Sequence, residues 1–216
     1  MKKRIVIVDD HPIVRQGFAQ LINQEEDLVV IGEAEDAPGA VELIEDTDPD
    51  LALVDLSLKN SNGIELIKDL KKIKPELKVL VISLHDESVY AERALRAGAK
   101  GFIMKAEATE SVMTAIRMVL RGEVYLSEKM RNHLLSSMTG GGATRALSPT
   151  EVLSDREFEV FQAIGRGAST REIADSLCLS VKTIETYKSH LKQKLALKNS
   201  TELMQYAIEW QITSGP

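Results

Sequence analysis

The chain has 216 residues, a formal net charge of −6 and 44% hydrophobic side chains, values that fit one large or, slightly favoured, two small domains with packed cores. No apolar stretch approaches the ~20 residues of a membrane span, and the apolar run near the N-terminus is too short for a signal peptide. We therefore expect a cytoplasmic protein with no membrane partner. The single cysteine, Cys178, excludes an internal disulfide, and we expect a small buried apolar residue there rather than a redox thiol.

Residues 1–121 alternate between apolar runs and segments with helical periodicity. The apolar runs show no polar alternation, which is typical of strands buried on both faces. They lie at Ile5–Val8, Leu28–Ile31, Leu51–Val54, Val79–Ile82 and Phe102–Met104. The helical segments lie near 12–23, 37–45, 64–72, 87–97 and 107–121. This succession predicts an α/β domain with a five-stranded parallel, doubly wound sheet.

Polar residues follow several of these strands at the edge where such sheets bind ligands. They are Asp9, Asp10, Asp55, Ser83 and Lys105. Each has an ordinary explanation when taken alone: a helix cap for the acidic pair, a loop serine, or a solvated lysine. Their joint position at strand ends instead predicts a site for a divalent cation and a phosphoryl group.

The residue types suggest how such a site would work. Mg²⁺ prefers oxygen ligands, which the carboxylates of Asp10 and Asp55 and the backbone carbonyl of Ser57 can supply, while Asp9 can hold a coordinated water. Asp55 can attack phosphorus in line and form an aspartyl-phosphate. Lys105 offers a positive charge to the phosphoryl oxygens, and Ser83 offers a hydroxyl donor.

Residues 122–149 differ in composition from the segments on either side. A short helix is expected at about 127–137, and the segment from Ser136 to Thr144 is small, polar and glycine-rich. Such a composition predicts a flexible linker between two domains.

Residues 150–216 read as an all-α domain of four helices. Ser154 with Glu157, and Ser169 with Glu172, have the spacing of capping boxes and mark the first two helices. The third helix is expected from Val181 to about Ala196 and the fourth from about Ser200 to Trp210. Two short helices joined by a tight turn predict a helix-turn-helix.

The third helix of this domain is amphipathic and locally basic. Ile184, Leu191 and Leu195 share one face, whereas Lys182 to Lys198 contains five lysines and one acid, Glu185. A solvated surface helix is the alternative. The neighbouring short helix and the local positive charge favour a DNA-contacting helix.

These features together resemble a known family. Residues 1–121 resemble a response-regulator receiver domain, with its acidic pair, phosphoacceptor aspartate, Ser/Thr, aromatic and lysine in order. The resemblance implies a flavodoxin-like fold, Mg²⁺, phosphorylation of Asp55 by a sensor histidine kinase, and Ser83 and Phe102 as switch residues. One departure is Lys59, which stands where the family usually has a proline.

The stretch from Leu153 to Leu195 resembles the LuxR-type DNA-binding domain of the NarL/FixJ response regulators. The resemblance implies base-edge contacts by Glu185, Thr186 and Ser189. It implies phosphate contacts by Lys182, Thr183, Tyr187, Lys188 and Lys192. Glu185 departs from a common lysine: an acid can accept from a cytosine amino group but repels phosphates. Tyr187 replaces a common histidine and can still reach a phosphate.

The two resemblances imply a phosphorylation-dependent transcription regulator rather than an enzyme, one that catalyses only its own phosphoryl transfer and dephosphorylation. We expect phosphorylated Asp55 to draw the Ser83 hydroxyl and Phe102 to turn inward. The domains then separate, or the chain forms a homodimer on double-stranded promoter DNA, where RNA polymerase is a further partner to consider.

Two alternatives remain open. A phosphatase of the haloacid dehalogenase type would need a second acid two residues after the nucleophile, where this chain has Ser57. An atypical regulator controlled by a protein partner would not need phosphate.

Overall fold

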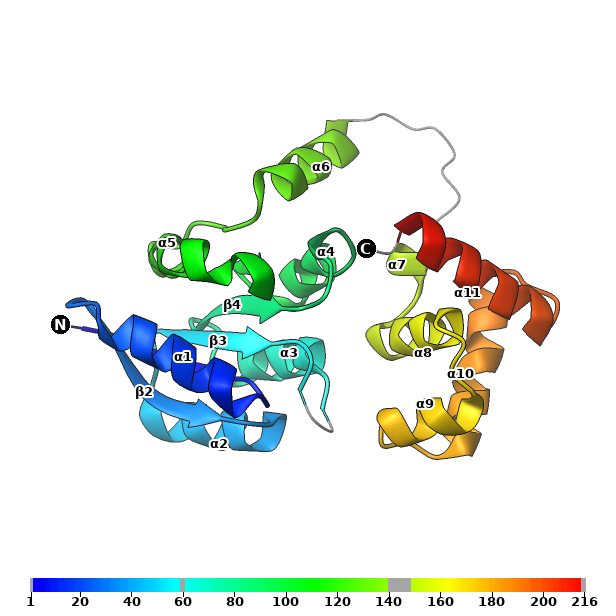
Figure 1. The fold of residues 1–216 in the computed structure, drawn as a ribbon, viewed down its shortest axis with the longest axis horizontal. Helices are drawn as coiled ribbons and strands as arrows, with labels where there is room; N and C mark the ends of the chain where they lie inside the picture. The colour runs from blue at the N-terminus through cyan, green and yellow to red at the C-terminus, as the bar shows by residue number, and fades with distance from the viewer. Residues whose placement is uncertain (1, 59–60, 140–148, 215–216) are drawn as a thin grey trace. The chain divides into compact units, whose positions relative to one another are not determined.

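The computed structural model describes residues 2–58, 61–139 and 149–214. The chain divides into two compact units, Met1–Gly140 and Gly141–Pro216 (Figure 1). Lys59 and most of the glycine-rich segment lie outside the described residues, so the expectations about them stay predictions.

The first unit is built on a five-stranded parallel sheet with the order β2-β1-β3-β4-β5. Its strands are β1 (Lys3–Val8), β2 (Leu28–Ala34), β3 (Leu51–Asp55), β4 (Lys78–Ser83) and β5 (Gly101–Met104). The predicted doubly wound sheet is confirmed, and each strand is at least as long as its apolar run because the flanking residues also pair with neighbouring strands. All five residues of β3 are buried, as expected for a central strand covered on both sides.

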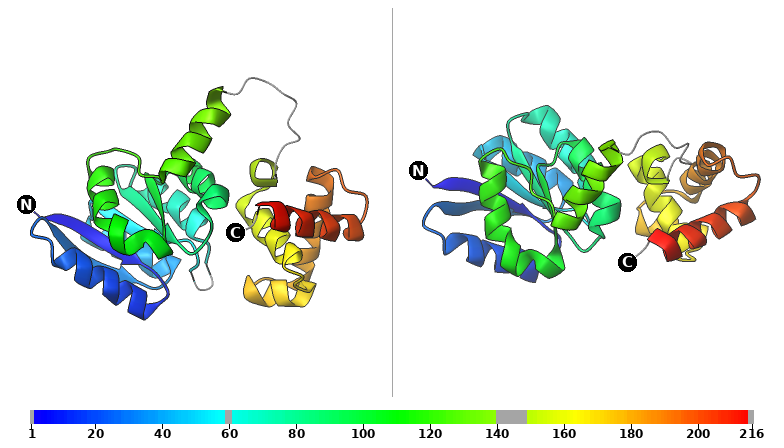
Figure 2. Two further views of the ribbon diagram at one scale, coloured as in Figure 1. Left: turned by 45° about the horizontal axis from the view of Figure 1, so that its top comes forward. Right: turned by 90° about the horizontal axis from the view of Figure 1, so that it is seen from above.

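Five helices cover the two faces of this sheet. They are α1 (Pro12–Asn23), α2 (Ala37–Thr47), α3 (Gly63–Ile73), α4 (Glu87–Ala97) and α5 (Ala108–Leu120), the last preceded by the short 3₁₀ helix η1 (Lys105–Glu107). Helices α1 and α5 share one face, where Phe18, Ile22 and Ile116 pack on the strands, and α2, α3 and α4 cover the other (Figures 1 and 2).

The loop after β3 closes tightly on the start of α3. The Asn62 side chain caps this helix by accepting from the backbone N–H groups of Ile64 and Glu65. Gly63 donates to the carbonyl of Leu56 at 3.2 Å. A Cβ at Gly63 would lie 2.5 Å from Leu56 Cα and 2.6 Å from the Asp55 carbonyl oxygen, so only glycine fits beside the end of β3.

A further helix, α6 (Glu128–Thr139), follows the receiver-like segment. The backbone N–H of Ser127 donates to the Glu87 carboxylate at 2.9 Å. Met130 is 3% exposed. The short helix expected near 127–137 is therefore present and packs against α4.

The second unit contains α7 (Pro149–Val152), α8 (Asp155–Gly165), α9 (Thr170–Ser176), α10 (Val181–Lys194) and α11 (Ser200–Ser214). The capping boxes predicted at the starts of α8 and α9 are both present. An aromatic cluster joins α8 to α11, since the Trp210 ring lies 5.4 Å from that of Phe158 and 5.7 Å from that of Phe161.

The expectation that Cys178 is buried was wrong. Cys178 is exposed and has φ 54° in the turn between α9 and α10. Its N–H donates to the Asp175 carbonyl at 3.3 Å, and the N–H of Leu179 donates to the Ala174 carbonyl at 2.9 Å. These bonds end α9 in a Schellman motif, and the left-handed residue of that motif points its side chain outward whatever its polarity.

Candidate functional site

Three strand-end groups meet at one edge of the sheet. Asp55 ends β3, Asp9 follows β1, and both side chains are about 1% exposed. Lys105 follows β5, and its Nζ lies 2.7 Å from Oδ2 of Asp55 and 2.7 Å from Oδ2 of Asp9. The parallel sheet thus brings together residues that lie 46 and 50 positions apart in the sequence.

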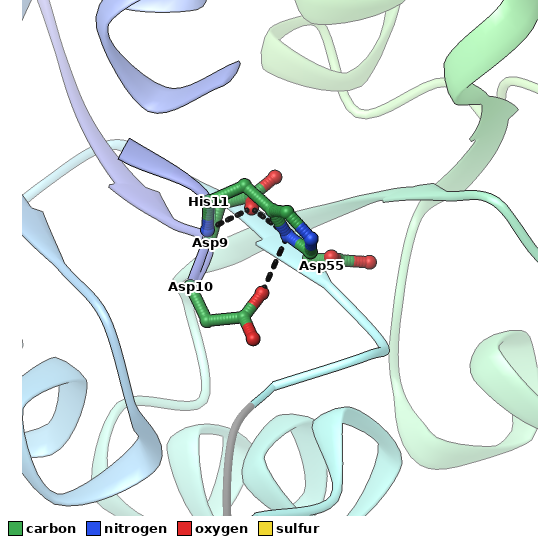
Figure 3. A group of neighbouring side chains, drawn as sticks. All are labelled: Asp9, Asp10, His11 and Asp55. Carbon is green, nitrogen blue, oxygen red and sulfur yellow. Dashed lines mark hydrogen bonds and ion pairs between the residues drawn. The ribbon is translucent and has the colours of Figure 1, made fainter. Parts of the chain in front are cut away.

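An imidazole joins this acidic group (Figure 3). His11 Nδ1 lies 2.7 Å from Oδ1 of Asp10 and 3.3 Å from Oδ1 of Asp9. The His11 backbone N–H also donates to Asp9 at 2.9 Å. Sequence reasoning missed His11, whose only signal was its position directly after the acidic pair.

The donor set fits a divalent cation. One ligand atom from each of Asp9, Asp10, His11 and Asp55 lies within 4.8 Å of the others. Asp9 Oδ2 and Asp10 Oδ1 are buried, and among the described residues their neighbours are single ion-paired nitrogens, Lys105 Nζ and His11 Nδ1 respectively. Buried carboxylate oxygens with so few donors keep lone pairs that can serve as ligands for Mg²⁺.

The electrostatics of Asp55 and Lys105 are coupled. Burial raises the pKa of the Asp55 carboxyl, and the hydrogen bond from Lys105 offsets only part of this effect. Burial alone would lower the pKa of Lys105, but its bonds to Asp55 and Asp9 raise it instead. Lys105 therefore keeps its positive charge at the site.

Ser57 contacts Asp55, and Ser83 ends the neighbouring strand β4. The Ser57 backbone N–H donates to Asp55 Oδ1 at 3.1 Å. Its hydroxyl lies 2.9 Å from His85 Nε2. Ser83 is fully buried, and its Oγ accepts from the His85 backbone N–H at 3.1 Å. The His85 ring, which sequence reasoning also missed, stacks on Tyr90 of α4 with centroids 4.5 Å apart.

Phe102 is fully buried. Its role as a switch residue stays a prediction. Its backbone N–H is also tied to the Tyr125 carbonyl at 3.0 Å.

In the second unit, α10 shows the predicted amphipathic pattern. Ile184 and Leu191 are fully buried, and Ser180 caps the helix by accepting from the Thr183 N–H at 3.0 Å. Of the candidate DNA contacts, four are exposed and four are partly buried. The exposed ones are Lys182, Glu185, Thr186 and Ser189, and the partly buried ones are Thr183, Tyr187, Lys188 and Lys192.

Two of these candidates interact with α9. Glu185 Oε1 accepts a hydrogen bond from the Thr170 hydroxyl at 3.1 Å and lies 3.4 Å from Lys188 Nζ. Lys188 also donates to the Thr170 hydroxyl. In contrast, the ammonium groups of Lys182 and Lys192 have no ion-pair partner within the described part of the chain.

Two family models match the chain. Residues 5–117 match the "Response regulator receiver domain", and residues 151–207 match "Bacterial regulatory proteins, luxR family". Among the described residues, no helix is long and apolar enough to cross a membrane.

Two of the similar proteins cover nearly the whole chain, and a third covers about two thirds of it. The chain is 36% identical over 210 residues to the oxygen regulatory protein NreC of Staphylococcus carnosus, covering 95% of this chain and 97% of that protein. RcsB of Salmonella enterica serovar Typhimurium, bound to promoter rprA with phosphomimetic BeF3−, is a similar solved structure. It has 27% identity and a TM-score of 0.65, covering 96% of this chain and 99% of that one. A LuxR-family two-component response regulator from Aurantimonas has 32% identity and a TM-score of 0.60, covering 64% of this chain and 99% of that one.

Proposed function

Since the chain belongs to the NarL/FixJ response regulators, which join a receiver domain to a LuxR-type DNA-binding domain, we propose that Asp55 is its phosphoacceptor and that α10 is its DNA-reading helix. The observation that carries the proposal is the meeting of Asp9, Asp55 and Lys105 at one sheet edge. We assign residues 1–121 to the receiver, 122–149 to the linker and 150–216 to the DNA-binding domain.

The receiver residues have separate roles in phosphoryl transfer. Asp55 supplies the attacking oxygen. Lys105 moves from the Asp55 carboxylate to the phosphoryl oxygens and neutralises their charge. Asp9, Asp10, Asp55 and the Ser57 carbonyl would hold Mg²⁺, which stabilises the charge of the transferring group when it is bound. The donor is a sensor histidine kinase, and the protein catalyses only its own phosphoryl transfer and dephosphorylation.

Phosphorylation changes the contacts of Ser83. Its hydroxyl oxygen accepts from His85, so its proton is available to a phosphoryl oxygen on Asp55. The change passes from Ser83 and His85 to α4, on which the His85 ring stacks, and Phe102 turns toward the space that Ser83 vacates. A shift of the loop between β4 and α4 accompanies this turn of Phe102.

The second unit acts on promoter DNA. Lys182, Thr183, Tyr187 and Lys192 contact phosphates, whereas Thr186 and Ser189 contact base edges in the major groove. RcsB has been solved both on promoter DNA and as two dimers bound to two DNAs. We propose that this chain likewise forms a homodimer on DNA when it is phosphorylated, positioned where RNA polymerase can contact it.

Labelling with radioactive acetyl phosphate and Mg²⁺ tests the phosphoacceptor. Asp55→Asn should abolish labelling, whereas Asp46→Asn, which removes an exposed acid of α2, should leave it unchanged. Undiminished labelling of Asp55→Asn would contradict the assignment. Rapid turnover by the wild type would favour the phosphatase alternative, and absence of labelling would favour control by a protein partner.

A further inference from the structure

Thr170, Glu185 and Lys188 form a triad that ties α10 to the first residue of α9. The hydroxyl of Thr170 donates to Glu185 Oε1 at 3.1 Å and accepts from Lys188 Nζ. The two charged groups also lie 3.4 Å from each other. Their positions are thus set by the protein itself, so less side-chain freedom is lost when DNA binds.

Within the described part of the chain, the triad retains one unused acceptor and one unused donor. Glu185 Oε2 has no partner among the residues that the structure describes, and the Glu185 side chain is 60% exposed. An ammonium group has three N–H bonds, of which Lys188 uses one for Thr170 and one for Glu185. The triad therefore presents an acceptor and a donor side by side on α10.

This arrangement is complementary to the major-groove edge of one base pair. A C·G pair presents the cytosine N4 donor next to the guanine O6 acceptor. These two atoms are hydrogen-bonded to each other and so lie about 2.9 Å apart. Glu185 and Lys188 are likewise neighbours: Lys188 Nζ lies 3.4 Å from Oε1, and the free Oε2 belongs to the same carboxylate. We propose that Glu185 accepts from cytosine N4 and Lys188 donates to guanine O6, with Thr170 as the positioning residue.

The other base pairs fit less well. A G·C pair would place guanine O6 against the Glu185 carboxylate. An A·T pair offers the adenine N6 donor, but the neighbouring N7 acceptor repels the carboxylate and the thymine methyl crowds Lys188. In a C·G pair, guanine N7 instead gives Lys188 a second acceptor.

This inference rests on the proposed DNA-binding function, and it changes two of our predicted roles. Lys188 becomes a base reader instead of a phosphate contact. Glu185, which would repel phosphates if it stood alone, becomes part of a neutral pair whose charge does not oppose the DNA backbone.

Selection of bound duplexes from a random pool tests the inference. The full chain, phosphorylated with acetyl phosphate, should select a motif with one strongly preferred C·G pair in each half-site. Glu185→Ala should lose that preference by about 10- to 100-fold at this one position. Thr170→Val should weaken it, and Thr170→Ser, which restores the hydroxyl, should recover it.

Two controls separate base reading from charge. Glu209→Ala removes an exposed acid of α11 and should keep the motif. Replacing the guanine by hypoxanthine, which alters only the minor groove, should leave wild-type affinity unchanged, whereas reversing the pair to G·C should weaken it most. An unchanged motif for Glu185→Ala, or equally tighter binding of that variant to every duplex, would overturn the inference alone. A wild type that selects no motif would contradict the proposed function as well.

Discussion

The close approach of Gly63 to the end of β3 predicts that Gly63→Ala damages both stability and phosphorylation. The new Cβ would lie 2.5 Å from Leu56 Cα and 2.6 Å from the Asp55 carbonyl oxygen. Carbon atoms in contact need about 3.5 Å, so α3 and the strand end must separate by about 1 Å. Both neighbours are backbone atoms and cannot turn aside, so we expect a loss of about 1–3 kcal/mol.

The same shift moves the loop that carries Ser57, whose N–H holds Asp55 in place. A misplacement of about 1 Å can slow a reaction by about 100-fold. We therefore expect Gly63→Ala to lower the melting temperature of the receiver by about 4 °C per kcal/mol lost. It should also slow labelling by acetyl phosphate by up to about 100-fold.

Gly17→Ala is the matched control for this substitution. Gly17 lies within α1 and has no atom within 4 Å of the added Cβ. We expect this variant to be more stable by up to about 1 kcal/mol, since alanine is the better helix former. Wild-type melting and labelling of Gly63→Ala would refute the steric reasoning.

Three further substitutions test other parts of the structure. Cys178→Gly should raise the free energy of unfolding of the second unit by about 0.5–1 kcal/mol. The strain of a side chain in the left-handed region is larger than the conformational entropy that glycine loses on folding. Gly167→Ala, at φ 82°, should lower the free energy of unfolding in the same thermal melts. Lys105→Met should destabilise the receiver by about 3–5 kcal/mol near neutral pH, because it leaves a buried carboxylate unpaired. The pKa of Asp55 is raised by burial, so the folded state binds the proton more tightly than the unfolded state. Urea melts of Lys105→Met should therefore show its stability returning as pH falls through that raised pKa. A loss of stability that is independent of pH would argue against this cause. Lys182→Ala should lower the slope of log affinity against log salt by about 0.9 on every duplex, and a loss confined to one sequence would instead make Lys182 a base reader.

The fold could be predicted because its signals are local. Unbroken apolar runs such as Leu51–Val54 predict strands buried on both faces, and all of these residues are buried. The capping boxes of α8 and α9 formed as predicted because Ser154 and Ser169 satisfy backbone donors three residues away. The meeting of Asp9, Asp55 and Lys105 also followed from the sequence, since parallel strands align their carboxyl ends.

Contacts between loops and between helices could not be predicted in this way. The expectation for Cys178 failed because apolar neighbours in the sequence do not reveal the left-handed turn that points its side chain outward. His85 gave no pattern, and its bond to Ser57 depends on how two loops meet.

The sequence by itself determined the parallel sheet, the helical second domain and the strand-end groups, because periodicity, capping and strand direction act over short distances. Only the tertiary structure decided which polar side chains meet: His11 with the acidic pair, and Thr170 with Glu185 and Lys188. His11 directly follows the acidic pair, but the direction of its ring depends on the loop conformation. The contact of Thr170 with Glu185 and Lys188 depends on the packing of α9 on α10. The proposed role of Lys188 as a base reader rests on these contacts between α9 and α10.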